Sequence, residues 1–489
     1  MAAAAIARVL AFGAAYPFFN QIDEALHFDL VVKYGSGRVP WGLEPFSREA
    51  ARLIPLFQSP EFIHRFASDA EIPPPLWSLP AGPAAAVYKD RLDRWRAHGN
   101  FEAVQPPLYY LAAGAWYRLG KLAGLREGVL LYWIRFLNAF AYGLLVWLAH
   151  RWMKRLYPQR LYYRLGVPLL IAFFPQQSAF SVNNDAFSPL FFGAAFFGLV
   201  EILDARPAGA SAYARAGLLT AAALLVKISN VAIAAVFVVV LASRLEAAAA
   251  KPEKREWRNL LLLAFSAALP LALWCAWNMA LLGDPTGGAS KAKVLGWTPR
   301  PLSQYSAHPI FTPGGFAHFL RFAALTFWRG EFWWRGAMIR QRWLDGFYLV
   351  SSSGLPLLAV AAVARAGRRN LAREENALAL GFFAGVVSIL FLVAMSVVYL
   401  FPDGGYPTRA DPYLYSGRLI WGMLAPFALL YLRGLERACA ALRLRPGLVL
   451  VVLVVAFTAA ETILPAGLFA SRYNFFHIPK DPAATAMFR

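Results

Sequence analysis

The chain has 489 residues, of which 59% are hydrophobic and 16% charged, and its formal net charge is +20. Soluble domains are about 45–50% apolar, so the composition excludes an ordinary soluble protein and indicates a membrane protein. Lys and Arg collect in cytoplasmic loops of such proteins, and no nucleic-acid partner is expected. Cys275 lies in an apolar segment and Cys439 in a basic one, so neither a disulfide nor a cysteine metal site is expected.

Eleven apolar runs along the chain are interpreted as membrane helices, because a crossing takes about 20 residues. They occupy residues 2–19, 129–149, 165–181, 186–203, 214–226, 231–242, 260–282, 347–364, 377–400, 419–432 and 448–468. The predicted fold class is an all-α polytopic membrane protein with about 11 transmembrane helices, within a range of about 9 to 13. The first run lacks the basic start of a signal peptide, and Arg8 within it is expected to snorkel to the cytoplasmic face.

The charge of the connecting segments sets the predicted topology. The segments 151–164, 244–258, 365–373 and 433–445 are basic, which places them in the cytoplasm. To keep the basic segments on one side, residues 227–230 must form a tight external turn. For the same reason, residues 107–121 must form an interfacial or re-entrant helix.

This topology leaves two long segments outside, residues 20–106 and 283–345, within a single transmembrane domain that spans residues 1–489. Both exceed ordinary connecting loops, which indicates that they carry function and contain interfacial helices. The first is proline-rich around residues 73–83, and the second is basic and rich in tryptophan.

Two carboxylates and an imidazole stand where the first membrane helix is expected to end: Asp23, Glu24 and His27. If that helix continues, Asp23 and His27 lie one turn apart on one face. A carboxylate beside an imidazole can relay a proton or bind a divalent cation such as Mg²⁺ or Mn²⁺. These residues are equally typical of a polar helix end that meets water, so spacing alone leaves both interpretations open.

Two further motifs carry residues suited to a substrate with a phosphate. Gln105 and Tyr109 belong to the segment Gln-Pro-Pro-Leu-Tyr-Tyr, which begins the interfacial helix. Tyr415 and Arg418 stand where an external loop enters a membrane helix. An Arg at that depth needs an anionic partner, and a guanidinium binds phosphate bidentately. The alternatives are an aromatic belt for the tyrosines and snorkelling for the arginine.

Three lysines complete the set of substrate-binding candidates. Lys227 lies in its external turn, and Lys291 and Lys293 begin the basic stretch of the second external segment. A basic excess outside breaks the loop-charge rule, and an anionic ligand is the simplest reason for it. Because the rule weakens for long loops, the excess is also compatible with no ligand.

In this order, the motifs resemble the C-type glycosyltransferase superfamily, which includes the protein mannosyltransferases and aminoarabinose transferases. The Asp-Glu-x-x-His at residues 23–27 is similar to the acidic first-loop motif of that superfamily. The segment 105–110 is similar to its Pro-Pro-Leu-Tyr segment. Ser-Gly-Arg-Leu at residues 416–419 is similar to a Gly-Arg-Tyr element, with leucine in place of the usual aromatic residue.

The resemblance implies an enzyme that transfers a sugar from a polyprenyl-phosphate donor to a lipid, glycan or protein acceptor. It implies a bacterial inner membrane, with the site facing the periplasm. Asp23 is then the expected general base and Glu24 the second candidate, while Arg418 and Lys227 hold the phosphate. His27 orients the base or joins Asp23 as a metal ligand.

Three other functions compete with this one. A transporter or lipid flippase needs charges near the bilayer midplane and related halves, and the sequence has few of the former and no repeat. A polysaccharide polymerase or ligase of similar architecture uses a diphosphate carrier, and the motif order does not separate it from the first interpretation. A non-catalytic scaffold fits poorly with two elaborate external segments.

Overall fold

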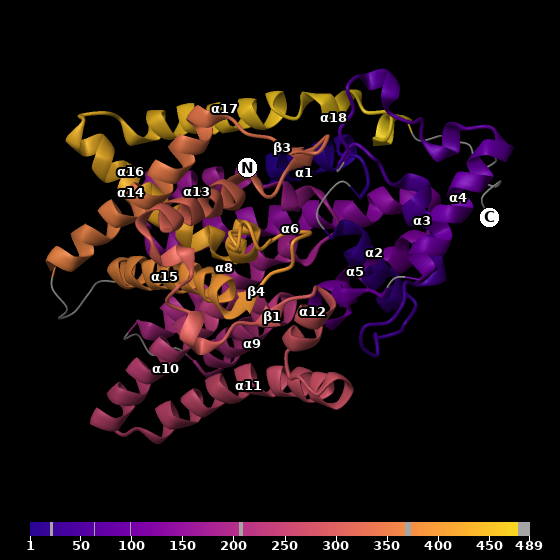
Figure 1. Cartoon of the computed structure of the whole chain (residues 1–489). Helices are drawn as coiled ribbons and strands as arrows, with labels where there is room; N and C mark the ends of the chain where they lie inside the picture. The colour runs from indigo at the N-terminus through magenta and orange to yellow at the C-terminus, as the bar shows by residue number, and fades with distance from the viewer. Residues whose placement is uncertain (20–22, 63, 98, 205–208, 367–372, 478–489) are drawn as a thin grey trace.

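The computed structural model describes residues 1–19, 23–62, 64–97, 99–204, 209–366 and 373–477. Within these ranges the chain is a bundle of helices, and its strands are two antiparallel pairs of two residues each (Figure 1). The predicted all-α class is therefore confirmed.

Eight helical segments in the described ranges are long and apolar enough to cross a membrane, and three shorter apolar helices accompany them. Together they coincide one for one with the eleven apolar runs. The long ones contain α6 (Glu127–Leu156), α8 (Ser188–Leu203), α10 (Val231–Ala250), α11 (Lys254–Leu282), α14 (Arg342–Ala366), α15 (Arg373–Val398), α16 (Leu424–Ala441) and α17 (Pro446–Ile463). The shorter ones are α1 (Ala2–Ala15), α7 (Leu161–Ala172) and α9 (Ala210–Val226).

The connections gather at two ends of the bundle. The turns from α10 to α11 and from α16 to α17 lie at the left end in Figure 1. The helices of the first long segment lie at the right end. These two basic turns and the first long segment thus lie at opposite ends of the bundle, which is compatible with the topology that the loop charges predict. The short turn between α9 and α10 is a 3₁₀ helix, η6 (Ile228–Asn230), as expected for a tight connection.

The long segments are built from short helices rather than irregular loops. The first contains α2 (Glu24–Gly35), α3 (Arg48–Phe57), α4 (Ala81–Ala97) and η3 (Phe101–Val104), and α5 (Leu108–Leu122) follows it. The second contains α12 (Gly288–Val294), α13 (Pro313–Arg329), β1 (Thr298–Pro299), β2 (Trp333–Trp334) and β3 (Ala337–Met338). Helix α5 has the length of an interfacial helix and packs on α2 and α6.

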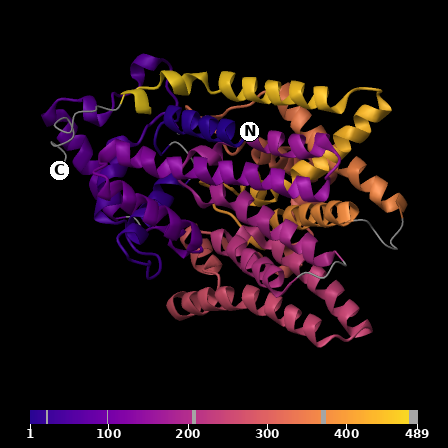
Figure 2. The same cartoon turned by 180° about the vertical axis from the view of Figure 1, so that it is seen from behind.

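Two helices mark the outer surface of the bundle. Helices α11 and α17 lie along opposite edges in both views (Figures 1 and 2). Only 28% and 22% of their apolar windows are buried. Such exposed apolar faces are suited to lipid, because helices satisfy their own backbone hydrogen bonds there.

A buried arginine holds the first helix against the bundle. Arg8 was expected to snorkel to the cytoplasmic face, and the structure shows that it does not. Its guanidinium donates to Glu461 on α17 and to the carbonyl oxygens of Ala172 and Phe174. The ion pair joins α1 to α17, and it avoids the high cost of an unpaired charge at this depth.

The C-terminal part of the described chain packs on the first long segment. Ser471 Oγ donates to Glu61 Oε2 at 2.5 Å, and Tyr473 Oη donates to the carbonyl oxygen of Pro73 at 2.8 Å. A separate contact involves the second long segment. Its strand β1 pairs with β4 (Tyr399–Leu400), which lies in the chain before Arg418.

Candidate active site

Asp23 lies in a break between two helices. Helix α1 ends at Ala15 and α2 begins at Glu24, so the first membrane helix does not continue through residue 23. Asp23 is the N-cap of α2 with φ +65°, a left-handed conformation that Asp tolerates better than most residues. Its carboxylate makes no capping hydrogen bond with α2, which leaves it available for other partners.

Arg418 is the main partner of Asp23. Its Nη2 donates to Asp23 Oδ2 at 2.8 Å and its Nη1 to Asp185 Oδ2 at 3.1 Å, while Nε lies 3.5 Å from Glu331 Oε2. The neighbouring Gly417 brings the chain against α13. A Cβ on Gly417 would lie 2.2 Å from the backbone nitrogen of Phe327, so this close approach requires glycine.

Lys227 completes the cluster. It lies in the turn between α9 and α10, and its ammonium pairs with Asp185. We call Asp23, Asp185, Lys227, Glu331 and Arg418 the charged cluster. Its three carboxylates and two cations come from five separate parts of the chain. Asp185 and Glu331 are buried, and Asp23 is its most accessible acid, with 20% of its side chain exposed.

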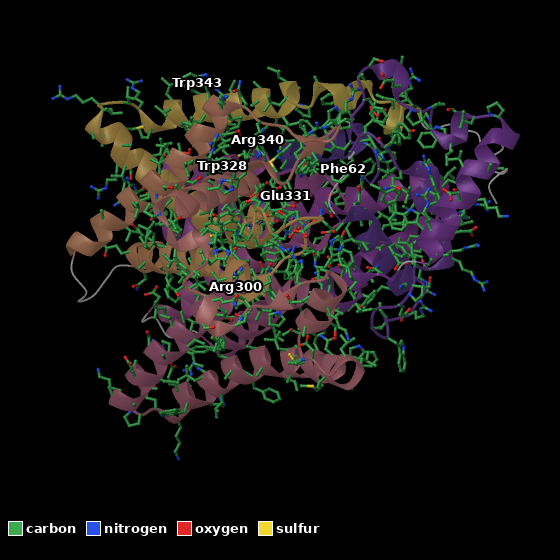
Figure 3. The ribbon with its side chains drawn as sticks, viewed as in Figure 1. Phe62, Arg300, Trp328, Glu331, Arg340 and Trp343 are labelled. Carbon is green, nitrogen blue, oxygen red and sulfur yellow. The ribbon has the colours of Figure 1, made fainter. Side chains whose placement is uncertain are left out.

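Glu331 reaches Arg418 from the segment between α13 and the β2–β3 hairpin, near the middle of the molecule in Figure 3. The preceding Gly330 has φ +77°, and a Cβ there would lie 2.4 Å from Gln176 Oε1. One Glu331 oxygen is buried without a hydrogen-bond partner. Burial raises the pKa of Glu331 above its usual value, although Arg418 opposes that shift.

Glu24 is held in a buried ion pair, and this position does not fit its expected role as a second base. Its two carboxylate oxygens accept from Arg135 at 2.7 Å each, and also from the backbone N–H groups of Phe19 and Val182. The side chains of Glu24 and Arg135 are fully buried. Because both oxygens are held and no water reaches them, Glu24 fixes the helix break rather than moving a proton.

His27 faces α5 rather than pairing with Asp23. Its Nδ1 lies 2.6 Å from Tyr110 Oη, and burial lowers the pKa of the imidazole to about 4. The expected Asp23–His27 metal pair has no support from this geometry. Within the described residues, no group of three or more His, Cys, Asp or Glu side chains is arranged to hold a metal ion.

A second polar group lies beside the charged cluster. Glu102 accepts from Lys291 and from Gln105 at 2.5 Å each. Gln105 Oε1 accepts from Asn184, the neighbour of Asp185, at 3.2 Å. Burial alone would raise the pKa of Glu102, but the attraction of Lys291 outweighs it and lowers the pKa to about 2.

The remaining candidates lie farther from Arg418. Lys293 is exposed on α12, and the Tyr109 ring is buried on α5. The hydroxyl of Tyr415 donates to Asp411 at 2.8 Å and not to a member of the cluster. The structure thus brings together Asp23, Lys227 and Arg418 from the predicted set, and it does not bring Lys293 or Tyr415 to them.

One cavity reaches the charged cluster, and an apolar groove lies near it in the chain. The cavity, of about 660 Å³, is lined by Asp23 and mostly apolar side chains, among them Phe19, Leu26, Phe46 and Phe101. The groove, of about 510 Å³, runs between α13, α14, α15 and α16. Its lining includes Ile420, two residues beyond Arg418, but no member of the charged cluster. Asp23 therefore lines the cavity, and the groove comes within two residues of Arg418 along the chain.

Sequence reasoning did not single out Asp185, Glu331 or Glu102. A signal existed for Asp185, because a carboxylate at the start of an apolar helix is costly without a function or partner. Glu331 is one acid in a long basic segment, and nothing in the local sequence distinguishes it.

Residues 9–402 match the family described as "Predicted membrane protein (DUF2142)". This range contains every member of the charged cluster except Arg418. No curated protein matches the chain.

Among solved structures, the chain is similar to the apo oligosaccharyltransferase of Archaeoglobus fulgidus, with 10% identity and a TM-score of 0.42, over 97% of this chain and 56% of that one. It is similar to apo ArnT from Cupriavidus metallidurans, with 13% identity and a TM-score of 0.37, over 90% and 73%. A third is the Archaeoglobus fulgidus oligosaccharyltransferase AglB in complex with an inhibitory peptide and a dolichol-phosphate, with 10% identity and a TM-score of 0.37, over 100% and 56%.

The chain spans 56% of the length of the archaeal oligosaccharyltransferase and 73% of ArnT. The family match covers far more than half of the 489 residues, and the protein therefore belongs to the DUF2142 family of polytopic helical membrane proteins.

Proposed function

We propose that this protein is a membrane glycosyltransferase that moves a sugar from a polyprenyl-phosphate donor to an acceptor hydroxyl. The observation that carries the proposal is the position of Asp23. Asp23 lines a cavity of about 660 Å³, while Arg418, which binds it at 2.8 Å, lies two residues before Ile420 in the lining of an apolar groove among membrane helices.

In the proposed reaction, the acceptor hydroxyl gives its proton to Asp23 as its oxygen forms a bond to the anomeric carbon. The bond between that carbon and the phosphate oxygen breaks, and the phosphate leaves with the electron pair. A positioned carboxylate suits the first event. The cations Arg418 and Lys227 suit the second, because preorganised positive charge stabilises a departing anion.

The charged cluster also suggests how the base is activated. A donor phosphate that binds Arg418 Nη2 would replace Asp23 there, because Asp185 accepts from Nη1 and Nε faces Glu331 at 3.5 Å. Donor binding would thus release the Asp23 carboxylate to accept the proton of the acceptor hydroxyl.

The groove between α13 and α16 fits the lipid part of such a donor. Its lining is almost entirely aliphatic and aromatic, with Ser352 and Ser353 as the polar exceptions. A polyprenyl chain in this groove would place its phosphate at the Arg418 end.

The test is an assay of release of the lipid phosphate by purified protein in lipid vesicles that contain a polyprenyl-phosphate sugar. Release that depends on an added acceptor supports the proposal. Movement of the intact donor between leaflets without release would indicate a flippase, and a strict need for a diphosphate donor would indicate a polymerase or ligase. A divalent cation is optional in this reaction because the leaving group is already a phosphate, so a strict need for Mg²⁺ or Mn²⁺ would return Asp23 and His27 to consideration as ligands.

We propose that the site faces outward from the cytoplasmic membrane of a bacterium, toward the periplasm. Two exposed positions test this: a cysteine at Gln304, in the second long segment, and one at Lys154, in the last turn of α6 within the first basic segment. In intact cells an impermeant thiol reagent should label the first and not the second. The reverse pattern would place the site in the cytoplasm.

A further inference from the structure

A second cavity adjoins the one that contains Asp23. The smaller cavity has a volume of about 370 Å³ and lies within the first long segment, between residues 58–64 and α4. The two share three lining residues: Gln58, Phe62 and Trp95. A molecule that occupies both therefore passes beside these three side chains.

The two cavities differ in chemistry. The cavity at Asp23 is lined mainly by aromatic and aliphatic side chains. The smaller one is lined by the guanidinium groups of Arg91 and Arg94 and by the imidazole of His64, and no carboxylate is among the described residues of its lining. The smaller cavity therefore favours an anion, and Trp95 gives it a large apolar face beside that charge.

The two arginines are arranged to act together. Arg91 and Arg94 are three residues apart on α4, which places them on one face of the helix. Arg94 pairs with Asp90, and 66% of each side chain is exposed. Pairs so exposed contribute little, so an incoming phosphate or carboxylate can replace Asp90 at small cost. Guanidinium groups suit such anions because they bind them bidentately.

The wall between the cavities is held in place by the β2–β3 hairpin. The backbone N–H of Arg335 donates to the carbonyl oxygen of Glu61 at 2.6 Å, and that of Gly336 donates to the carbonyl oxygen of Phe62 at 3.4 Å. The hairpin follows directly on Glu331, so one segment contacts both the charged cluster and Phe62 (Figure 3). The passage past Phe62 is thus anchored relative to Asp23.

Building on the proposed function, we propose that the smaller cavity binds the acceptor, a saccharide that carries a phosphate or carboxylate. The anion binds Arg91 and Arg94, the sugar lies along Trp95 and Phe62, and a hydroxyl reaches Asp23 through the larger cavity. The donor lipid lies on the other side of Arg418, in the groove between α13 and α16. The two substrates then meet at Asp23 without competing for space.

The test measures binding rather than transfer, so it succeeds or fails independently of the proposed reaction. The full chain in phosphatidylcholine nanodiscs is titrated calorimetrically with glucose 6-phosphate as the probe and with glucose as the uncharged comparison. The parent protein should bind the phosphate sugar more tightly than glucose. The double variant Arg91→Ala/Arg94→Ala should weaken that binding about tenfold or more.

Two variants separate a lost anion site from a damaged fold. Arg96→Ala removes an exposed arginine from the same helix outside the cavity lining, and its affinity for the probe should stay within about twofold of the parent. Arg91→Lys/Arg94→Lys keeps the charge and should retain part of the binding. The inference is overturned if the probe does not bind, if the alanine variant binds it as the parent does, or if polyprenyl phosphate displaces it.

Discussion

Asp23→Asn is the change that most directly tests the proposed base. Asparagine keeps the size of the side chain and also tolerates the left-handed backbone at φ +65°. It cannot accept the acceptor proton. We expect turnover to fall about a hundredfold or more, the usual contribution of a positioned general base, which corresponds to about 2.7 kcal/mol on the barrier.

The fold should survive this substitution. The amide oxygen of asparagine can still accept from Arg418, so the loss is the difference between a charge-assisted and a neutral hydrogen bond, roughly 1 kcal/mol at most. The 20% exposure of the Asp23 side chain reduces that cost further. Arg418 keeps Asp185 and Glu331 as partners. Donor affinity should be unchanged or higher, because one competitor for the guanidinium loses its charge.

The assay combines three measurements on purified protein in lipid: release of lipid phosphate, donor affinity and thermal stability. Asp403→Asn is the matched control, because its side chain is 76% exposed and lies outside the charged cluster. A variant Asp23→Asn that folds, binds donor and turns over at the parent rate would refute the assignment. Equal loss of all three properties would instead assign Asp23 a structural role.

Three further changes follow from the buried charges. Asp185→Asn removes the carboxylate that pairs with two cations, so thermal stability, measured by a melting scan in detergent, should fall together with activity; an unchanged melting temperature would contradict its role in the cluster. Arg8→Ala leaves Glu461 buried without its cation and should cost about 3–5 kcal/mol, whereas Arg8→Met with Glu461→Met should cost less, as judged by denaturant unfolding. The pKa of Glu331 is raised above the ordinary value of 4.5 in the folded protein. The stability that this shift contributes is fully present below pH 4.5 and is lost as the pH rises through the folded-state pKa. Glu331→Gln should therefore flatten the dependence of the melting temperature on pH just above 4.5.

The sequence by itself determined the membrane architecture. Apolar runs and the charge of the segments between them are local properties, and lipid leaves helices as the main way to satisfy the backbone along such runs. For that reason all eleven runs correspond to helices, and the short turn at residues 227–230 and the helix at 108–122 were predictable. Asp23, Lys227 and Arg418 were recognisable because charged groups at membrane-helix ends need partners.

Only the tertiary structure decided which partners those residues have. Asp23 and Arg418 are 395 positions apart, and their contact depends on how α2, α13 and α16 pack. The same packing gives the adjacent Asp23 and Glu24 opposite roles: the helix break turns one carboxylate to a cavity and buries the other against Arg135. The role of each charged side chain depends on its burial and its ion-pair partners in three dimensions, and the neighbouring residues in the sequence do not reveal these.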